Sequence, residues 1–219
     1  MDLQIIQENI PLFVKGMKVT VTLGAIGIVL SILFGFMIAL FRFFKVPILT
    51  RILTAYIELS RNTPLLIQLF FLYYGLPKLG IPLAKELAAI IGLTFLGAAY
   101  MAEVFRASFE SVSQIQLEVG RSLGFNGFQL ATVVLLPQGM KLAIPSVGAN
   151  CIFLLKETSV FSAIAIMDLT NVTKDLIGMY YMTREFLLML VVSYSILIIP
   201  MVVILYWLEK SVGGVSAGS

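Results

Sequence analysis

Histidine is absent from this 219-residue chain, and cysteine occurs once, at Cys151. Without histidine the chain cannot form a histidine-based proton relay or a Ser-His-Asp triad, and one cysteine excludes an intrachain disulfide. The sequence also contains no GxxxxGK[ST] phosphate-binding loop, so we expect no ATP binding and hydrolysis of the P-loop kind within this chain. Cys151 lies in an apolar run, where packing is its expected role.

Charge is also scarce. Only 12% of the residues are charged and 59% are hydrophobic, whereas about a quarter of the residues in soluble domains are charged. This composition indicates a membrane protein. The hydropathy is high along the whole chain, so we interpret the first apolar run as a true span rather than a cleaved signal peptide. The net charge of +3 suits contact with anionic lipid headgroups and gives no indication of a nucleic-acid partner.

The apolar runs predict an all-α membrane protein with five transmembrane helices, because each run is about long enough to cross a hydrocarbon core of roughly 30 Å. The predicted spans are residues 19–41, 51–77, 87–102, 141–167 and 186–208. Ahead of them, mixed apolar and polar residues predict a short helix on the membrane surface that Pro11 interrupts. The predicted domain division is a surface segment over 1–15, a transmembrane domain over 16–208 and a flexible cytoplasmic tail over 209–219.

Two of the predicted spans contain polar interruptions. In the second, Asn62 and Thr63 precede Pro64, which suits the first position of a new helix, so we predict a break over residues 62–64. In the fourth, Lys156 and Glu157 lie at membrane depth, where ionisable groups normally face a bundle interior or a water-filled path. The sequence leaves open whether these two residues form a structural pair or take part in transport.

Small side chains recur every three or four residues along the first span. They allow close approach of helix backbones in lipid, and either intrachain packing or a subunit interface accounts for them. The residues concerned are Thr20, Gly24, Gly27, Ser31 and Gly35.

A polar segment over residues 111–137 separates the third and fourth predicted spans. We interpret it as a cytoplasmic loop with two short helices, one of which ends at Gly124, since glycine adopts the left-handed conformation that closes a helix. Glu118 and Ser122 share one face of that helix, with Arg121 beside them. Residues 122–140 are uncharged but contain Gly, Asn, Gln and Pro, so we do not assign them a span.

The distribution of lysine and arginine predicts the orientation. Five spans place the two ends of the chain on opposite sides of the membrane. The side that holds the central loop carries eight Lys and Arg residues and the other side carries six, by our assignment of connecting segments. The positive-inside rule therefore favours a cytoplasmic central loop, with the N-terminus outside and the C-terminus in the cytoplasm.

Four motifs in order resemble a known family. The stretch Glu118-Val-Gly-Arg-Ser-Leu-Gly124, followed by Val134-Leu-Leu-Pro-Gln138, resembles the EAA loop of bacterial ABC importer permeases. Residues 58–71 (ELSRNTPLLIQLFF) resemble the family's E-x-x-R-G-T-P-L-L-x-Q segment, and residues 100–106 and 156–159 resemble pieces of its polar amino acid uptake subfamily. The sequence departs from the family at Val119-Gly120, where Ala-Ala is usual, and at Asn62, where Gly is usual.

The resemblance implies the type I ABC importer permease fold and a permease subunit that translocates an amino acid across the bacterial cytoplasmic membrane as a multi-pass protein. The implied partners are a dimer of ATP-binding cassette ATPases, a second permease copy or a paralogous permease, an extracellular or periplasmic amino-acid-binding protein, and membrane lipid. This chain would itself be no enzyme and hold no cofactor or metal, because ATP and Mg²⁺ bind the partner ATPase. The implied ATPase-coupling residues are Glu118, Gly120, Arg121, Ser122, Leu123 and Gly124.

Polarity within the spans, together with the resemblance, gives a predicted substrate site. Glu157 would meet an ammonium group or a basic side chain, and hydrogen-bonding side chains would meet the carboxylate. The predicted substrate-binding residues are Glu157, Asn62, Thr63, Thr158 and Ser159. The alternative function is a secondary transporter or channel driven by an ion gradient, which the polar fourth span and the broken second span favour and the absence of an evident internal repeat disfavours.

Overall fold

The computed structural model describes residues 2–44 and 47–213, and these are helical apart from short connections. The α-helices are α1 (Leu3–Phe43), α2 (Pro47–Arg61), α3 (Leu65–Phe70), α4 (Lys85–Glu110), α5 (Gln114–Ser122), α6 (Gly127–Gln129), α7 (Leu136–Glu157), α8 (Leu169–Tyr180) and α9 (Thr183–Gly213). Two π-helical segments, η1 (Phe71–Gly75) and η3 (Leu130–Leu135), and two 3₁₀ segments, η2 (Leu76–Leu79) and η4 (Thr158–Ile164), extend them.

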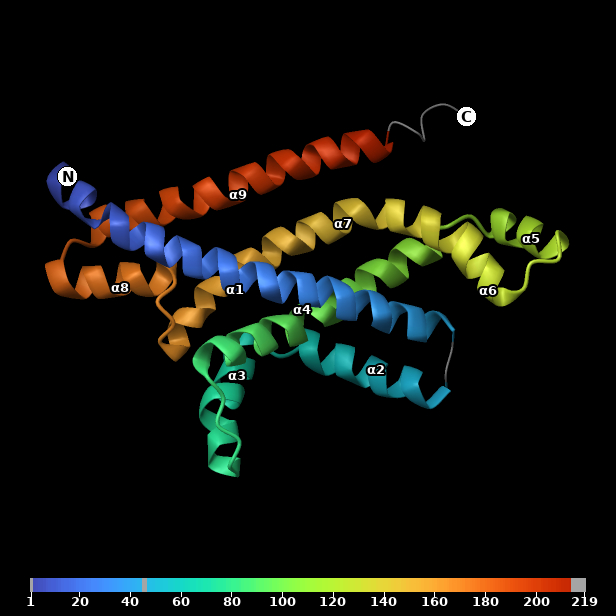
Figure 1. Cartoon of the computed structure of the whole chain (residues 1–219), viewed down its shortest axis with the longest axis horizontal. Coiled ribbons are helices and arrows are strands. Elements are labelled where there is room, and N and C mark those ends of the chain that lie inside the picture. Colours follow the sequence, from blue (N-terminus) through green and yellow to red (C-terminus); the bar gives the residue numbers. More distant parts are fainter. Residues whose placement is uncertain (1, 45–46, 214–219) are drawn as a thin grey trace.

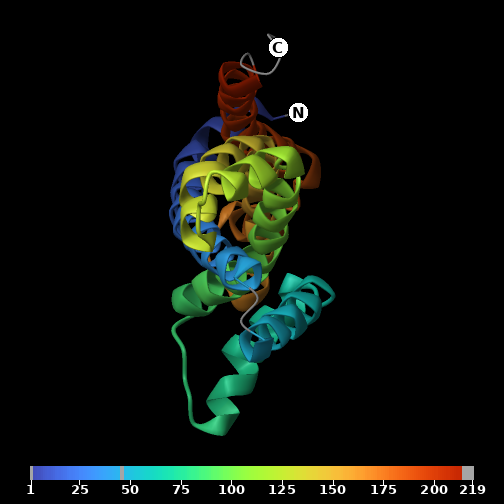
Figure 2. The same cartoon turned by 90° about the vertical axis from the view of Figure 1, so that its right-hand side faces the viewer.

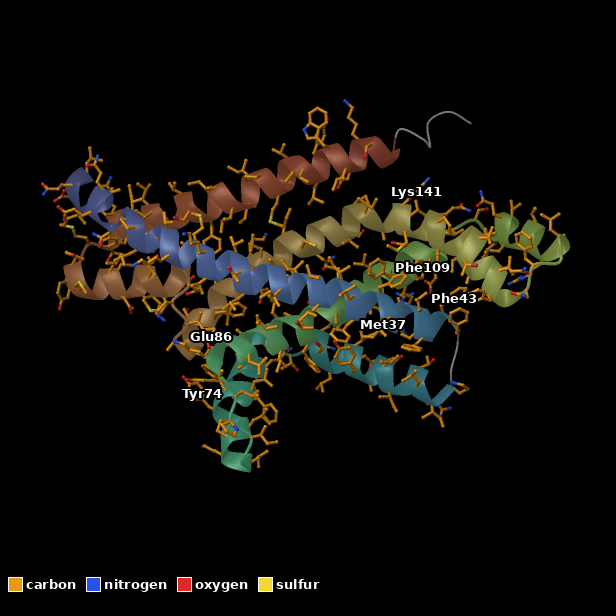
Figure 3. The ribbon with its side chains drawn as sticks, in the orientation of Figure 1. Met37, Phe43, Tyr74, Glu86, Phe109 and Lys141 are labelled. Carbon is orange, nitrogen blue, oxygen red and sulfur yellow. The ribbon has the colours of Figure 1, made fainter. Side chains whose placement is uncertain are left out.

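Four long helices follow the long axis of the molecule: α1, α4, α7 and α9 (Figure 1). The start of α1 and the end of α9 lie toward opposite ends of this axis, and α5 and α6 lie at the end where α1 finishes. Figure 2 shows α2 and α3 on one side of the other helices. The segment η1–η2 projects away from the bundle and carries Tyr74, whereas Phe109 is buried among α1, α4 and α7 (Figure 3).

Four helical segments among the described residues are long and apolar enough to cross a membrane: Leu3–Phe43, Lys85–Glu110, Gly127–Ile164 and Thr183–Ser211. They confirm the all-α class, and they overlap four of the predicted spans. The predicted second span is divided between α2 and the shorter apolar segment Leu65–Leu79, and the division falls at residues 62–64, as the sequence predicts. A fifth crossing remains a prediction.

Two predicted helix boundaries are wrong. Helix α1 runs without interruption through Pro11, because Phe13 packs into a core cluster with α8 and α9 that holds this part of the helix. The fourth span does not begin near Lys141 but extends back to Gly127. Asn126 and Gln129 form a capping box there, so the polar residues that argued against helix in lipid instead start the helix.

The C-terminal end also differs from the prediction. Helix α9 continues past residue 208 to Gly213, with Pro200 inside it. The rest of the predicted tail, residues 214–219, lies outside the described residues. Residues 209–213 are therefore helical rather than part of an irregular tail. That the chain leaves the membrane near residue 209 remains a prediction.

The small residues of α1 pack within the chain. All five members of the stripe are buried, and a Cβ atom built on Gly35 would lie 2.4 Å from Met101 Cβ and 2.9 Å from Ala98 O on α4. A Cβ built on Gly97 of α4 would lie 2.2 Å from Ser31 Oγ. Contacts this short exclude a larger side chain, so Gly27, Ser31 and Gly35 serve the α1–α4 contact. Gly24 instead faces Leu155 of α7 and Thr158 of η4, and the Thr20 hydroxyl accepts the Leu169 N–H of α8.

Candidate functional site

Helix α5 is closed by a Schellman motif, as the predicted role of Gly124 requires. The Gly124 N–H donates to Arg121 O at 2.9 Å, and the Phe125 N–H donates to Gly120 O at 3.0 Å. Gly124 has φ +81°, a left-handed conformation that glycine adopts without strain. The first predicted helix of the central loop is therefore confirmed. The second is not a separate helix, because α6 continues into η3 and α7.

One face of α5 is apolar and exposed. Ile115, Val119 and Leu123 are spaced four residues apart, and 71%, 53% and 70% of these residues are exposed. A spacing of four places them side by side along the helix. Glu118, Arg121 and Ser122 are exposed as well. The short helix thus exposes a surface of mixed apolar and charged side chains at this end of the molecule.

Gly120 is the one member of the predicted coupling set that faces the chain itself. It is buried, and a Cβ built on it would lie 2.6 Å from Leu130 Cδ2 of η3. The glycine that replaces the family's usual alanine thus allows α5 to lie close to η3.

The side chain of Gln68 forms hydrogen bonds across the break over residues 62–64. Its side-chain amide donates to Ser60 O at 3.1 Å and to Thr63 O at 3.0 Å, carbonyls at or beside the break. A helix break inside a membrane is tolerated when such groups find internal partners. The side chains of Ser60 and Tyr56 both donate to Phe95 O, at 2.9 and 2.6 Å, and so fix α2 to α4.

The structure divides the predicted substrate residues into two groups. Asn62 and Thr63 lie at the break and donate their side-chain hydrogen bonds to Glu58 O and Leu59 O. Glu157 is half-buried at the end of α7, and Ser159 lies in η4, which packs against α3. Thr158 is fully buried and donates to Leu155 O at 2.6 Å, so in this conformation its hydroxyl is closed to solutes.

Lys156 and Glu157 do not form the pair considered from the sequence. Among the described residues neither forms an ion pair, and Lys156 is exposed whereas Glu157 is half-buried. Neighbouring positions on a helix point about 100° apart, which separates their side chains.

A polar cleft lies between α2, α4 and α7, and its volume is about 630 Å³. This volume is within the range of small-molecule sites. The side chains that line it come from the end of α2, from the half of α4 nearest α5, and from α7. The polar members are Arg61, Tyr100, Glu103, Arg106, Ser108, Ser111, Ser146 and Asn150.

Most charged side chains near this cleft form ion pairs with one another. Glu103 pairs with Arg42 at the end of α1 and with Arg106 at 2.8 Å, and Arg106 also pairs with Glu110 at 2.6 Å. The network connects α1 to α4 at the end of the molecule that carries α5. The sequence does not reveal this network, because the pairing of Glu103 with Arg42 bridges sixty-one positions.

Arg61 is held differently, by aromatic contact. Its guanidinium carbon lies 5.2 Å from the centre of the Tyr100 ring, and the Tyr100 ring lies 5.2 Å from the ring of Phe153 on α7. Ser146, Asn150, Phe153 and Glu157 share one face of α7, because their spacing of three, four or seven residues returns to the same side of a helix. The aromatic pair therefore lies between the level of Glu157 and the cleft.

A second buried polar cluster joins the start of α8 to Tyr194 of α9. Asp168 is fully buried at the N-cap of α8, and its Oδ1 accepts the Asn171 N–H at 2.8 Å. Its Oδ2 has no hydrogen-bond partner, and the same holds for the buried Thr170 hydroxyl and Tyr194 hydroxyl. Burial raises the pKa of Asp168 to about 7, although the backbone hydrogen bond from Asn171 and the charge of Lys174 act in the opposite direction.

This shift predicts a pH dependence of stability. Between pH 4 and pH 7 the folded carboxyl binds a proton that the unfolded one has released, so stability falls as pH rises through this window, by at most about 1.4 kcal/mol per pH unit. Asp168→Asn keeps the side-chain oxygen that caps α8 and removes the titration. We expect the melting temperature of the wild type in detergent to fall over this range relative to that of Asp168→Asn. Parallel curves for the two proteins would contradict the assignment.

Sequence reasoning missed three features of the site. The apolar spacing of Ile115, Val119 and Leu123 was present as a signal, but the interpretation of α5 rested on its polar residues. The hydrogen bonds of Gln68 reach back five and eight residues across the break, so they depend on the angle between α2 and α3. The cleft beside Arg61 depends on contacts between segments far apart in the chain. No periodicity reveals such contacts.

Comparison with known proteins defines the class. The model of the family described as "Binding-protein-dependent transport system inner membrane component" matches residues 31–214, and the chain belongs to this family. The resemblance to ABC importer permeases that the sequence motifs indicate is thereby confirmed.

Individual relatives agree with the family. The chain is 37% identical over 171 residues to the probable amino-acid permease protein YxeN of Bacillus subtilis, with 77% of this chain and 76% of the relative covered. It is 31% identical over 210 residues to the probable glutamine ABC transporter permease protein GlnM of the same organism, covering 96% and 97%.

Two solved structures share the fold. A crystal structure of an amino acid ABC transporter with histidines superposes with a TM-score of 0.92 at 29% identity, covering 96% of this chain and 99% of the other. An inward-facing structure of the MetNI methionine ABC transporter gives a TM-score of 0.78 at 19% identity, covering 92% and 96%, and supports the fold alone.

Proposed function

We propose that this protein is the permease subunit of an ATP-driven ABC importer that moves an amino acid across the bacterial cytoplasmic membrane. The family match and the named amino-acid permeases among its relatives carry this proposal. ATP with Mg²⁺ would bind a separate ATPase subunit, and a binding protein outside the cell would deliver the amino acid. A second copy of this chain or a paralogous permease would complete the translocation path.

Helix α5 is the proposed contact with the ATPase. Its exposed face of Ile115, Val119 and Leu123 suits a groove on a soluble protein, and Glu118, Arg121 and Ser122 would contact the groove's rim. The Schellman closure at Gly124 and the close packing of Gly120 on η3 make α5 a rigid extension of the spanning helices. Movement of the ATPase would therefore be passed on to α4 and α7.

The orientation follows from the same proposal. If α5 meets a cytoplasmic ATPase, then the end of the molecule that holds α5 and the end of α9 is cytoplasmic, and the start of α1 is outside. The lysine and arginine distribution supports this orientation.

The proposed path for the amino acid runs along one face of α7. Glu157, Asn62, Thr63 and Ser159 are the proposed contacts at the outer level, where α3 packs against η4. Thr158 would join them only after a local rearrangement, because it is fully buried. The aromatic pair Tyr100–Phe153 separates this level from the polar cleft, which lies toward α5.

Reconstituted transport tests the function. The permease, its ATPase and its binding protein are placed in liposomes, and uptake of labelled amino acids is measured with and without ATP. We expect uptake that requires both ATP and the ATPase. Uptake that persists without ATP and follows an imposed ion gradient would instead support the secondary transporter.

Two variants test the outer contacts in that assay. Glu157→Gln removes a charge on the proposed path, and Asn62→Gly removes an amide at the break. We expect each variant to reduce uptake several-fold, because a polar contact to the substrate would be lost, with unchanged ATPase assembly. Normal uptake with unchanged selectivity in both variants would show that the substrate contacts lie elsewhere.

A further inference from the structure

We propose that the polar cleft between α2, α4 and α7 is a second amino-acid site on the α5 side of the Tyr100–Phe153 pair, that Arg61 binds the substrate carboxylate there, and that the site admits neutral or acidic amino acids in preference to cationic ones. This inference rests on the proposed transport of an amino acid and specifies its substrate class.

Arg61 is a cation without an ionic partner. Within residues 2–44 and 47–213, no carboxylate forms an ion pair with it, and its identified contact is the face of the Tyr100 ring at 5.2 Å. Glu58, three residues earlier on α2, is exposed and does not pair with it. The guanidinium therefore keeps its planar set of N–H donors for a ligand, and this geometry matches a carboxylate.

The other charges of the cleft are already balanced. Glu103 is bound by both Arg42 and Arg106, and Arg106 is bound by both Glu103 and Glu110. Of the side chains that line the cleft, two are arginines and one is a glutamate. The charge that remains available to a ligand is thus the positive charge of Arg61.

The α7 side of the cleft offers an acceptor for the ammonium group. Asn150 donates through its side-chain nitrogen to Ser146 O at 2.8 Å, and this bond orients the amide. Its Oδ1 is left without an identified donor among the described residues and can accept from an ammonium group. An uncharged acceptor opposite a fixed cation suits a zwitterion whose carboxylate is the more strongly held end.

Selection by charge follows from this arrangement. The side chain of a lysine or arginine ligand would bring a second cation into a partly enclosed cleft whose one uncompensated charge is already positive. A neutral side chain meets no such repulsion, and an acidic side chain is attracted. We therefore expect at least tenfold discrimination against cationic amino acids at this site, independent of the selectivity of the external binding protein.

The test measures binding to the purified permease–ATPase complex without the binding protein. The complex is dialysed to equilibrium against an equimolar mixture of the twenty L-amino acids, and mass spectrometry identifies the retained amino acids. Arg61→Gln removes the charge, Arg61→Glu reverses it, and Arg51→Gln is a matched control at an exposed arginine on the same helix. Size-exclusion profiles and melting temperatures of all variants establish that each is folded.

We expect the wild type and Arg51→Gln to retain neutral or acidic amino acids. Arg61→Gln should retain at least fivefold less, and Arg61→Glu should shift the retained set toward lysine and arginine. The inference is overturned if the wild type retains no amino acid, retains cationic ones preferentially, or is matched by Arg61→Gln. ATP-dependent uptake by the same wild-type complex in liposomes distinguishes the two failures: if uptake is intact, the cleft assignment alone fails, and if uptake is absent, the proposed transport function fails too.

Discussion

Replacing Val119 with aspartate is expected to lower ATP-driven uptake at least tenfold while leaving the permease folded. Val119 lies in the middle of the exposed face of α5, between Ile115 and Leu123, and about half of it is exposed. If this face enters an apolar groove on the ATPase, the new carboxylate becomes buried without a partner, which costs several kcal/mol at an interface. In the free permease the same carboxylate is solvated, so stability changes little.

The controls separate coupling from folding. Gln114→Asp adds the same charge to an exposed position at the start of α5, away from the apolar face, and should transport normally. Val119→Leu keeps the face apolar and should retain most of the activity. Uptake is measured in liposomes, and the amount of ATPase that co-purifies with each permease is measured in parallel. Wild-type uptake by Val119→Asp would show that α5 does not couple to the ATPase through this face.

The second large effect concerns stability. Gly35→Ala places a Cβ atom 2.4 Å from Met101 Cβ and 2.9 Å from backbone atoms of α4, where no flexible side chain can move aside. The two helices must separate, and we expect a loss of about 3 kcal/mol, toward the upper end of typical overpacking effects. For a chain of this size, this corresponds to a fall in melting temperature of roughly 6–12 °C.

Gly178 provides the matched control. It is exposed within α8, and a Cβ built on it meets no atom within 4 Å. Gly178→Ala should therefore be neutral or stabilise the protein by up to about 1 kcal/mol, the difference in helix propensity. Melting curves of both variants in the same detergent check the pair. Equal melting temperatures would mean that α1 and α4 are not packed as closely as the glycine stripe requires.

Several features follow from the sequence because they depend on local chemistry. Long apolar runs predict four of the spans, since burying backbone polar groups in lipid requires helices. The break at residues 62–64 follows from Pro64, which cannot continue a helix from the residues before it. The end of α5 follows from Gly124, because glycine adopts the left-handed conformation at little cost. The family resemblance likewise depended on short contiguous motifs.

Other features were decided by the tertiary structure, because they depend on which segments meet. Periodicity in α1 could not distinguish a subunit interface from the observed packing within the chain. Pro11 remains within α1 because Phe13 is buried against α8 and α9, and a propensity rule does not include that contact. The ion pair of Arg42 with Glu103 leaves Arg61 as the cation available in the cleft, and only the approach of α1 and α2 to α4 determines this division of charge.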